Sequence, residues 1–154
     1  MKRRIFLKGS LATGAIGMAV STGLLTPRIS LAAWSKEAFE ATDVNGALNG
    51  LFGSSDLAGS DNIKIKAPDI AENGAVVPVS VTTDISGASS ISIIAEKNAQ
   101  PLAASFDLGP GTEGYVSTRI KMGKTASVIA VVKADGKLHS TGKEVKVTIG
   151  GCGG

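Results

Sequence analysis

The stretch AVVPVSVTTDI (residues 75–85) decides the fold class. Val77, Val79 and Val81 occupy every second position in it. Alternate residues of a β-strand point to opposite faces of the sheet, so this spacing predicts a strand with one buried face. Pro78 has no backbone N–H to donate to a neighbouring strand. We therefore expect this strand to lie at a sheet edge or to carry a bulge at Pro78.

Runs with the same period of two occur on both sides of this stretch, separated by Gly, Pro, Asn and Asp. They are NIKIKA (62–67), SISIIAE (90–96), LAASFDL (102–108), YVSTRIKM (115–122), ASVIAVVKADGKLHS (126–140) and KEVKVTI (143–149). In the third run, Leu102, Ala104 and Phe106 are expected on one face. Asp135-Gly136 is a two-residue hairpin signal. About seven or eight short strands of this kind predict an all-β protein, an immunoglobulin-like β-sandwich.

One or two short helices precede the strands. In WSKEAFEATDVNGALNGLFG (34–53), apolar residues have helical spacing, and Ser35 and Asp43 are suitable N-caps. We expect these helices to cover one end or edge of a sheet. The 154 residues suffice for one domain of ordinary size, and with aromatics at 4% its core must consist of Val, Ile, Leu and Ala.

Residues 1–33 are predicted to be an export signal. They have a basic start, an apolar stretch over 11–25, and small residues at Ser30, Ala32 and Ala33. Cleavage is expected after Ala32 or Ala33. RRIFLK (3–8) resembles the twin-arginine motif of proteins that are exported folded. The apolar stretch is too short and too rich in Gly and Thr for a membrane span. We therefore expect a periplasmic protein, exported either with a cofactor already loaded or together with a partner.

The charge of the mature chain argues against nucleic-acid binding. The signal holds five basic residues and no acid, so its removal changes the formal net charge from +3 to −2. A chain of that charge lacks the basic footprint that binds nucleic acid.

Patterns that carry chemistry are few. The one histidine, His139, has no partner for a triad or a metal site and is expected to be a solvated surface residue. The carboxylates form no close pair for acid–base chemistry. LGPGTEG (108–114) joins two strands, whereas a phosphate-binding glycine loop precedes a helix. We therefore predict no catalytic residue, no metal and no bound cofactor.

The remaining candidate is Cys152, the only cysteine, in the terminal motif GGCGG. Its neighbours are Gly150, Gly151, Gly153 and Gly154. Glycines have wide conformational freedom and no side chains to pack, so we expect residues 150–154 to form a flexible arm. An arm of three residues beyond the last strand reaches about 10 Å and can enter a narrow channel.

Three uses of this thiol remain open from the residues alone. It can be a handle that is carried to other active sites and activated there. It can link two copies of a secreted structural sandwich by a disulfide. It can be an enzymatic nucleophile, which we consider the weakest reading because no neighbouring residue would lower its pKa.

The terminal GGCGG, the twin-arginine signal and IKAPDIAENGAVVPVSV (65–81) together resemble the SoxY family of bacterial thiosulfate oxidation. The resemblance covers the whole chain. It implies an immunoglobulin-like sandwich over residues 34–149 with its helical segment, a swinging arm at 150–154, and a carrier instead of an enzyme. It also implies that sulfur intermediates are attached covalently to Cys152.

The same resemblance implies partners. SoxZ, which has no export signal of its own, would form a heterodimer with this chain and travel with it. SoxAX, a haem enzyme, would conjugate thiosulfate to Cys152, and SoxB, a dimanganese hydrolase, would release sulfate. SoxCD, a molybdenum–haem dehydrogenase, would oxidise the remaining sulfur where it is present.

Overall fold

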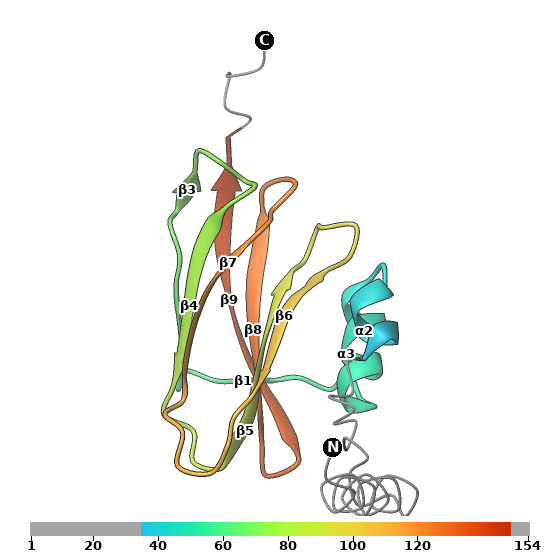
Figure 1. The fold of residues 1–154 in the computed structure, drawn as a ribbon, viewed down its shortest axis with the longest axis vertical. Coiled ribbons are helices and arrows are strands. Elements are labelled where there is room, and N and C mark those ends of the chain that lie inside the picture. The colour runs from blue at the N-terminus through green and yellow to red at the C-terminus, as the bar shows by residue number, and fades with distance from the viewer. Residues whose placement is uncertain (1–34, 149–154) are drawn as a thin grey trace, which may run out of the picture. The chain divides into compact units, whose positions relative to one another are not determined.

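The computed structural model describes residues 35–148, which form two helices followed by nine strands (Figure 1). The helices are α2 (Lys36–Glu40) and α3 (Val44–Phe52). The strands are β1 (Ala58–Gly59), β2 (Ile63–Lys66), β3 (Ile70–Ala71), β4 (Val77–Thr83), β5 (Ala88–Ala95), β6 (Leu102–Asp107), β7 (Tyr115–Ile120), β8 (Ala126–Ala134) and β9 (Lys137–Val147). The predicted signal (1–33) and terminal arm (150–154) lie outside the described residues.

The strands form two sheets that pack face to face as a sandwich. The larger sheet has the order β1-β9-β8-β5-β6, with β3 also paired to β9, and the smaller has the order β2-β4-β7. The predicted sandwich with two short helices before it is therefore confirmed. The two-residue strands β1 and β3 were not predicted. They pair in parallel with β9, and only this contact with a distant segment makes them strands.

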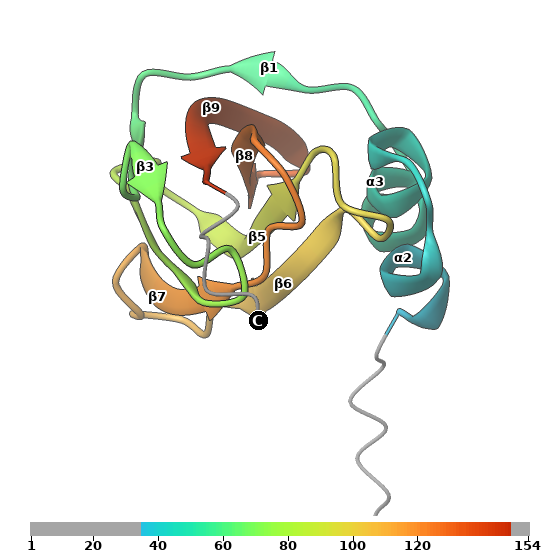
Figure 2. The same ribbon diagram turned by 90° about the horizontal axis from the view of Figure 1, so that it is seen from above.

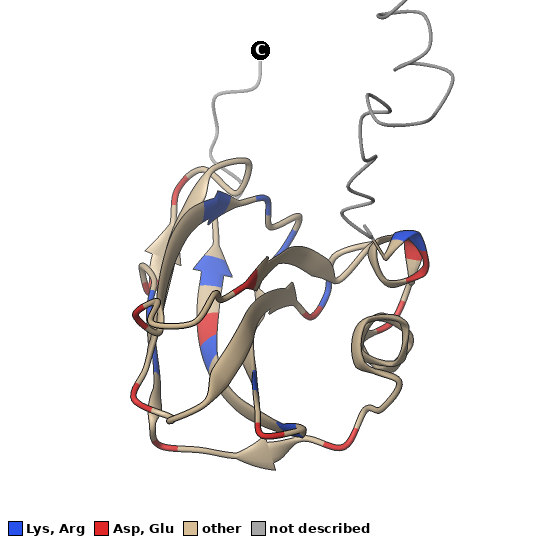
Figure 3. Cartoon of the chain, turned by 60° about the horizontal axis from the view of Figure 1, so that its bottom comes forward, with Lys and Arg blue, Asp and Glu red and all other residues tan. Residues whose placement is uncertain are grey.

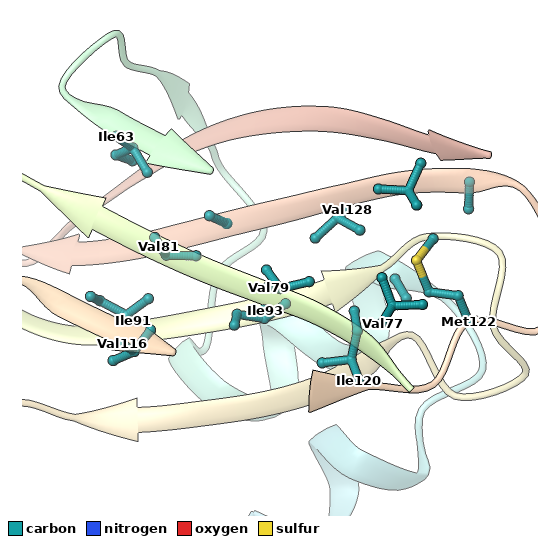
Figure 4. Packing of buried hydrophobic residues seen from close by; sticks show 14 of the residues in the cluster. Ile63, Val77, Val79, Val81, Ile91, Ile93, Val116, Ile120, Met122 and Val128 are labelled. Atoms are coloured by element: carbon teal, nitrogen blue, oxygen red, sulfur yellow. The ribbon is translucent and has the colours of Figure 1, made fainter. Parts of the chain in front are cut away.

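Valine side chains of β4 lie at the centre of the core between the sheets (Figure 4). Val77, Val79 and Val81 are at most 1% exposed. They belong to one cluster with Ile91 and Ile93 of β5 and with residues of β7 and β8. The buried face predicted from the alternation is confirmed.

Strands β8 and β9 are joined by Asp135-Gly136, whose φ angles are 48° and 75°. Positive φ at both central residues is the conformation of a type I′ hairpin turn, so this prediction is confirmed. The hairpin aligns β9 with β8 from the Lys137–Ala134 pair to the Val145–Ala126 pair. It therefore brings the end of β9 to the opposite end of the sandwich from the turn.

The helices cover the outer face of the larger sheet, so the prediction that they cover an end or edge was wrong. Ala38, Ala47 and Leu48 are fully buried. They pack in a second cluster with Ile94 of β5 and Val131 of β8, and Figure 2 shows both helices beside this sheet. Alternation marks which residues share a face, but it does not say what will cover the second face.

The prediction that Leu102, Ala104 and Phe106 share one face of β6 was also wrong. The pairing of β6 with β5 shifts register between Ile93 and Ile94. Leu102 consequently pairs with Ile94 and packs under the helices, whereas Phe106 packs against the core between the sheets. A bulge of this kind moves a strand's side chains to the other face from that point on.

The prediction that the strand containing Pro78 lies at a sheet edge is correct for its first residues and wrong for the strand as a whole. β4 lies in the middle of its sheet, between β2 and β7. β2 pairs only with residues 80–83 of β4, whereas Pro78 pairs with Arg119 of β7 alone. The first residues of β4 are thus an edge, where the missing N–H of proline is tolerated.

The two predicted N-caps differ in what they do. The Asp43 carboxylate accepts a hydrogen bond from Gly46 N at 2.8 Å, as an N-cap of α3 should. Ser35 makes no such bond to α2. Its hydroxyl donates to the carbonyl of Gly50 at 2.7 Å, which ties the start of α2 to α3.

We predict that Leu48→Ala lowers the free energy of unfolding by about 2–5 kcal/mol, because it leaves a cavity between α3 and the sheet. Urea denaturation followed by circular dichroism measures this change. The exposed neighbour in the same helix provides the control, since Asn49→Ala should change stability by less than about 0.5 kcal/mol. Equal effects of the two substitutions on stability would show that packing of the helices on the outer face of the sheet does not stabilise the fold.

Candidate functional site

The candidate residues Cys152, Gly150, Gly151, Gly153 and Gly154 lie outside the described residues. The described chain ends at Thr148, one residue after β9. The part of the candidate site that the structure describes is therefore the base from which the terminal motif extends. We call the last three described residues, 146–148, the root.

Strand β3 holds one side of the root. Ile70 pairs with Lys146 and Ala71 with Val147. The Lys146 N–H donates to the carbonyl of Asp69 at 2.9 Å, and the Thr148 N–H donates to the carbonyl of Ala71 at 3.1 Å. Backbone hydrogen bonds thus continue to the last described residue.

The connection between β7 and β8 holds the other side of the root. β8 begins at Ala126 and cannot pair with β9 beyond Val145. The Val147 N–H donates instead to the hydroxyl of Thr125 at 3.0 Å. Side-chain and backbone groups from two distant segments therefore hold the root from both sides.

A side-chain contact from the middle of β9 adds to this attachment. The Lys143 ammonium donates to the carbonyl of Ala67 at 2.7 Å and lies 3.0 Å from the Asp69 carboxylate. The Asp69 side chain is 89% exposed, so the ion pair itself adds little stability. The contacts of Lys143 orient residues 67–69, which lead into β3, along the edge of β9.

Gly74 lets the turn after β3 lie directly against the root. A Cβ at this position would clash with the carbonyl oxygen of Met122 and would lie 2.8 Å from the Val147 Cγ1. The carbonyl of Gly74 accepts a hydrogen bond from the Met122 N–H at 2.7 Å. The Asn73 carboxamide accepts from the Ala75 N–H at 3.0 Å and closes the turn. Only glycine therefore fits at this position, where the turn packs against both Met122 and Val147.

The residues that hold the root were not predicted as such from the sequence, although most of them lie in the stretch 65–81 that carried the resemblance. Asn-Gly at 73–74 is a recognised turn signal. It could have located the turn, but its packing against Val147 depends on pairing across the fold.

His139 lies half-buried on β9, paired with Val132 of β8 on one side and Ala58 of β1 on the other. Within residues 35–148, no group of three His, Cys, Asp or Glu side chains is placed to hold a metal ion. Neither described helix is long and apolar enough to cross a membrane.

The outer face of the smaller sheet is polar. Its β2 and β7 residues include Lys64, Lys66, Tyr115 and Arg119, and between them β4 presents small side chains. Hydrogen bonds from Ser80 and then Ser117, with a smaller effect of the Lys66 charge, lower the pKa of Tyr115, because they stabilise the phenolate. This face carries no residue of the root.

A family model described as "Sulfur oxidation protein SoxY" matches residues 48–152. The chain belongs to the SoxY family. The match covers most of α3, the whole sandwich and the root, and it ends at Cys152. Membership makes the chain a sulfur oxidation protein, with partners in the Sox system.

Among solved structures, the sulfur carrier protein SoxY from Chlorobium limicola f thiosulfatophilum is 48% identical in sequence. The similarity covers 75% of this chain and 100% of that one, with a TM-score of 0.64. No curated protein matches the chain.

We predict that Gly74→Ala weakens the attachment of the root, because the added Cβ must displace Met122 or Val147. The expected loss of unfolding free energy is about 1–3 kcal/mol, and amide hydrogen exchange at Val147 and Thr148 should accelerate. Urea denaturation and exchange measured by NMR test this. Gly59→Ala is the matched control, since a Cβ at Gly59 meets nothing within 4 Å. Unchanged exchange at the root in Gly74→Ala would refute this account of the glycine.

Proposed function

We propose that this chain is a covalent carrier of sulfur intermediates, attached at Cys152, during periplasmic thiosulfate oxidation. The observation that carries the proposal is the family match, which runs through the sandwich and ends at the chain's only cysteine. A relative that is 48% identical is described as a sulfur carrier protein. The residues 1–33, with the features of an export signal, support a periplasmic location.

The first step of the proposed cycle is an oxidative conjugation. The sulfur of Cys152 and the outer sulfur of thiosulfate form an S–S bond, and the thiol proton is released to solvent. Two electrons are lost in this step, and the haem enzyme SoxAX accepts them. The product is a thiosulfate group bound to Cys152 through sulfur.

The second step is a hydrolysis at SoxB. Water attacks the sulfonate sulfur, the bond from that sulfur to the neighbouring sulfur breaks, and sulfate and two protons leave. A persulfide anion remains on Cys152, and SoxCD oxidises it further where that enzyme is present. This chain supplies the attachment point and the arm in each step, so we propose that it is not itself an enzyme.

The way the root is held suits such a carrier. The sandwich and β3 hold the chain up to Thr148, so the thiol lies only four residues beyond a held position. A short tether of this kind raises the concentration of the attached intermediate at a bound enzyme to about mM. SoxZ is the proposed heterodimer partner, which would leave the cytoplasm together with this folded chain.

We predict that the mature chain, incubated with thiosulfate and SoxAX, gains the mass of one thiosulfate group and that a reductant removes it. Cys152→Ser should gain no mass. Intact-mass spectrometry measures both, and Cys152→Ser with an unchanged melting temperature serves as the control for folding.

A wild-type chain that stays a bare thiol under these conditions would contradict the carrier proposal. An obligatory disulfide dimer on non-reducing gels of the native compartment would instead favour a secreted structural sandwich cross-linked through Cys152.

A further inference from the structure

Three segments form the end of the sandwich at which the root lies. They are residues 69–76, which include β3 and its connection to β4, residues 96–101 between β5 and β6, and residues 121–125 between β7 and β8 (Figures 1 and 2). We call these three segments the exit end.

Hydrogen bonds join the three segments of the exit end. The Met122 N–H donates to the carbonyl of Gly74 at 2.7 Å, which joins the first segment to the third. The Asn98 carboxamide donates to the carbonyl of Lys121 at 2.7 Å and accepts from the Gly123 N–H at 3.0 Å, which joins the second to the third. The exit end is therefore one surface and not three independent loops.

The length of the tether determines what must touch this surface. Cys152 is the fourth residue after Thr148, and four residues span at most about 14 Å. If Cys152 carries the intermediate, as proposed above, an enzyme whose active site lies at the bottom of a channel can reach it only by bringing the channel rim against the exit end.

The exit end has two exposed large apolar side chains. Among the described residues, only Ile70, Val76 and Tyr115 are large apolar side chains classed as exposed. Ile70 (57% exposed) and Val76 (49%) both belong to the first segment of the exit end. Ile70 lies on β3 beside the root, and Val76 follows the turn that packs against it. An isolated exposed apolar residue needs no explanation, but a pair within one eight-residue segment at the base of the tether indicates a contact surface.

Lysines are also exposed at this end of the sandwich; Figure 3 marks the charged residues along the chain. Lys121 and Lys124 are exposed in the third segment and Lys97 in the second, and Lys146 is exposed on the root. The acids of the three segments are Asp69, Glu72 and Glu96, and the Asp69 carboxylate is paired with Lys143 of β9. Apart from that pair, the exit end and the root carry four lysines against two acids, so cations predominate there. The described chain as a whole has the opposite balance, with 11 Lys and Arg against 13 Asp and Glu.

We propose that the exit end is the docking surface for the enzymes that act on Cys152. The occupant is the rim of an active-site channel, with an apolar contact for Ile70 and Val76 and acidic side chains for Lys121 and Lys124. Opposite charges at such a rim increase the association rate, while a small contact area keeps the complex short-lived. A carrier that visits several enzymes in turn requires this combination.

The test uses the full mature chain in complex with SoxZ, and two double variants. Ile70→Ser with Val76→Ser removes the apolar pair, and Lys121→Glu with Lys124→Glu reverses the charge. Each should lower kcat/KM for the loading of thiosulfate by SoxAX by about tenfold or more, since truncating a central contact typically costs this much. The lysine variant should also reduce the dependence of the loading rate on salt.

Matched controls come from the rest of the sandwich. Tyr115→Ser removes the third exposed apolar side chain, which lies at the other end of β7 from the exit end. Lys64→Glu with Lys137→Glu makes the same change of charge away from the root. Both controls should load within about twofold of wild type, because surface changes outside a contact have small effects.

A small reagent separates docking from reactivity. The rate of Cys152 alkylation by iodoacetamide should be equal in all variants, because a small molecule needs no docking surface. Wild-type loading together with unchanged kcat/KM in both exit-end variants would overturn this inference and leave the proposed function intact. Failure of the wild-type chain itself to load would contradict the proposed function. If one double variant does not fold, the other decides the result.

Discussion

The hydrogen bonds that fix the end of β9 are the constraint on which the proposed function of this molecule depends. Ladder bonds from β3 and the Thr125 hydroxyl meet the last described residues from opposite sides. Val145, two residues before Val147, is completely buried in the core between the sheets. The strand therefore passes from the core to its final hydrogen bond within three residues. The point from which the terminal motif extends is thus set by the same packing that stabilises the sandwich.

The stretch 65–81 links the two sheets to this point. Its first residues belong to β2 in the smaller sheet, and Ile70 and Ala71 then pair with β9 in the larger. The turn at Gly74 leads into β4, whose valines occupy the centre of the core. One continuous segment thus contributes to both sheets, to the core and to the root. Both this segment and Cys152 lie within the family match over residues 48–152.

Local patterns were sufficient for many elements of the fold. The alternation of Val77, Val79 and Val81 identified β4 and its buried face, because the period of two is a property of the strand itself. Asp135-Gly136 identified the hairpin, because a type I′ turn needs residues that accept positive φ. Asp43 identified the start of α3, because its carboxylate accepts the free N–H of Gly46. In each case the decisive interaction lies within a few residues along the chain.

The sequence by itself determined the longer strands, the main hairpin, the helices and the presence of one cysteine next to four glycines. Only the tertiary structure decided that the helices cover the outer face, that Leu102 and Phe106 point to different faces, and that β3 pairs with the end of β9. These features depend on register and pairing between segments that lie far apart in the chain. Ala71 and Thr148 are 77 residues apart, yet they share a hydrogen bond at the root. No local pattern encodes such a contact, because its energy exists only once both sheets have formed.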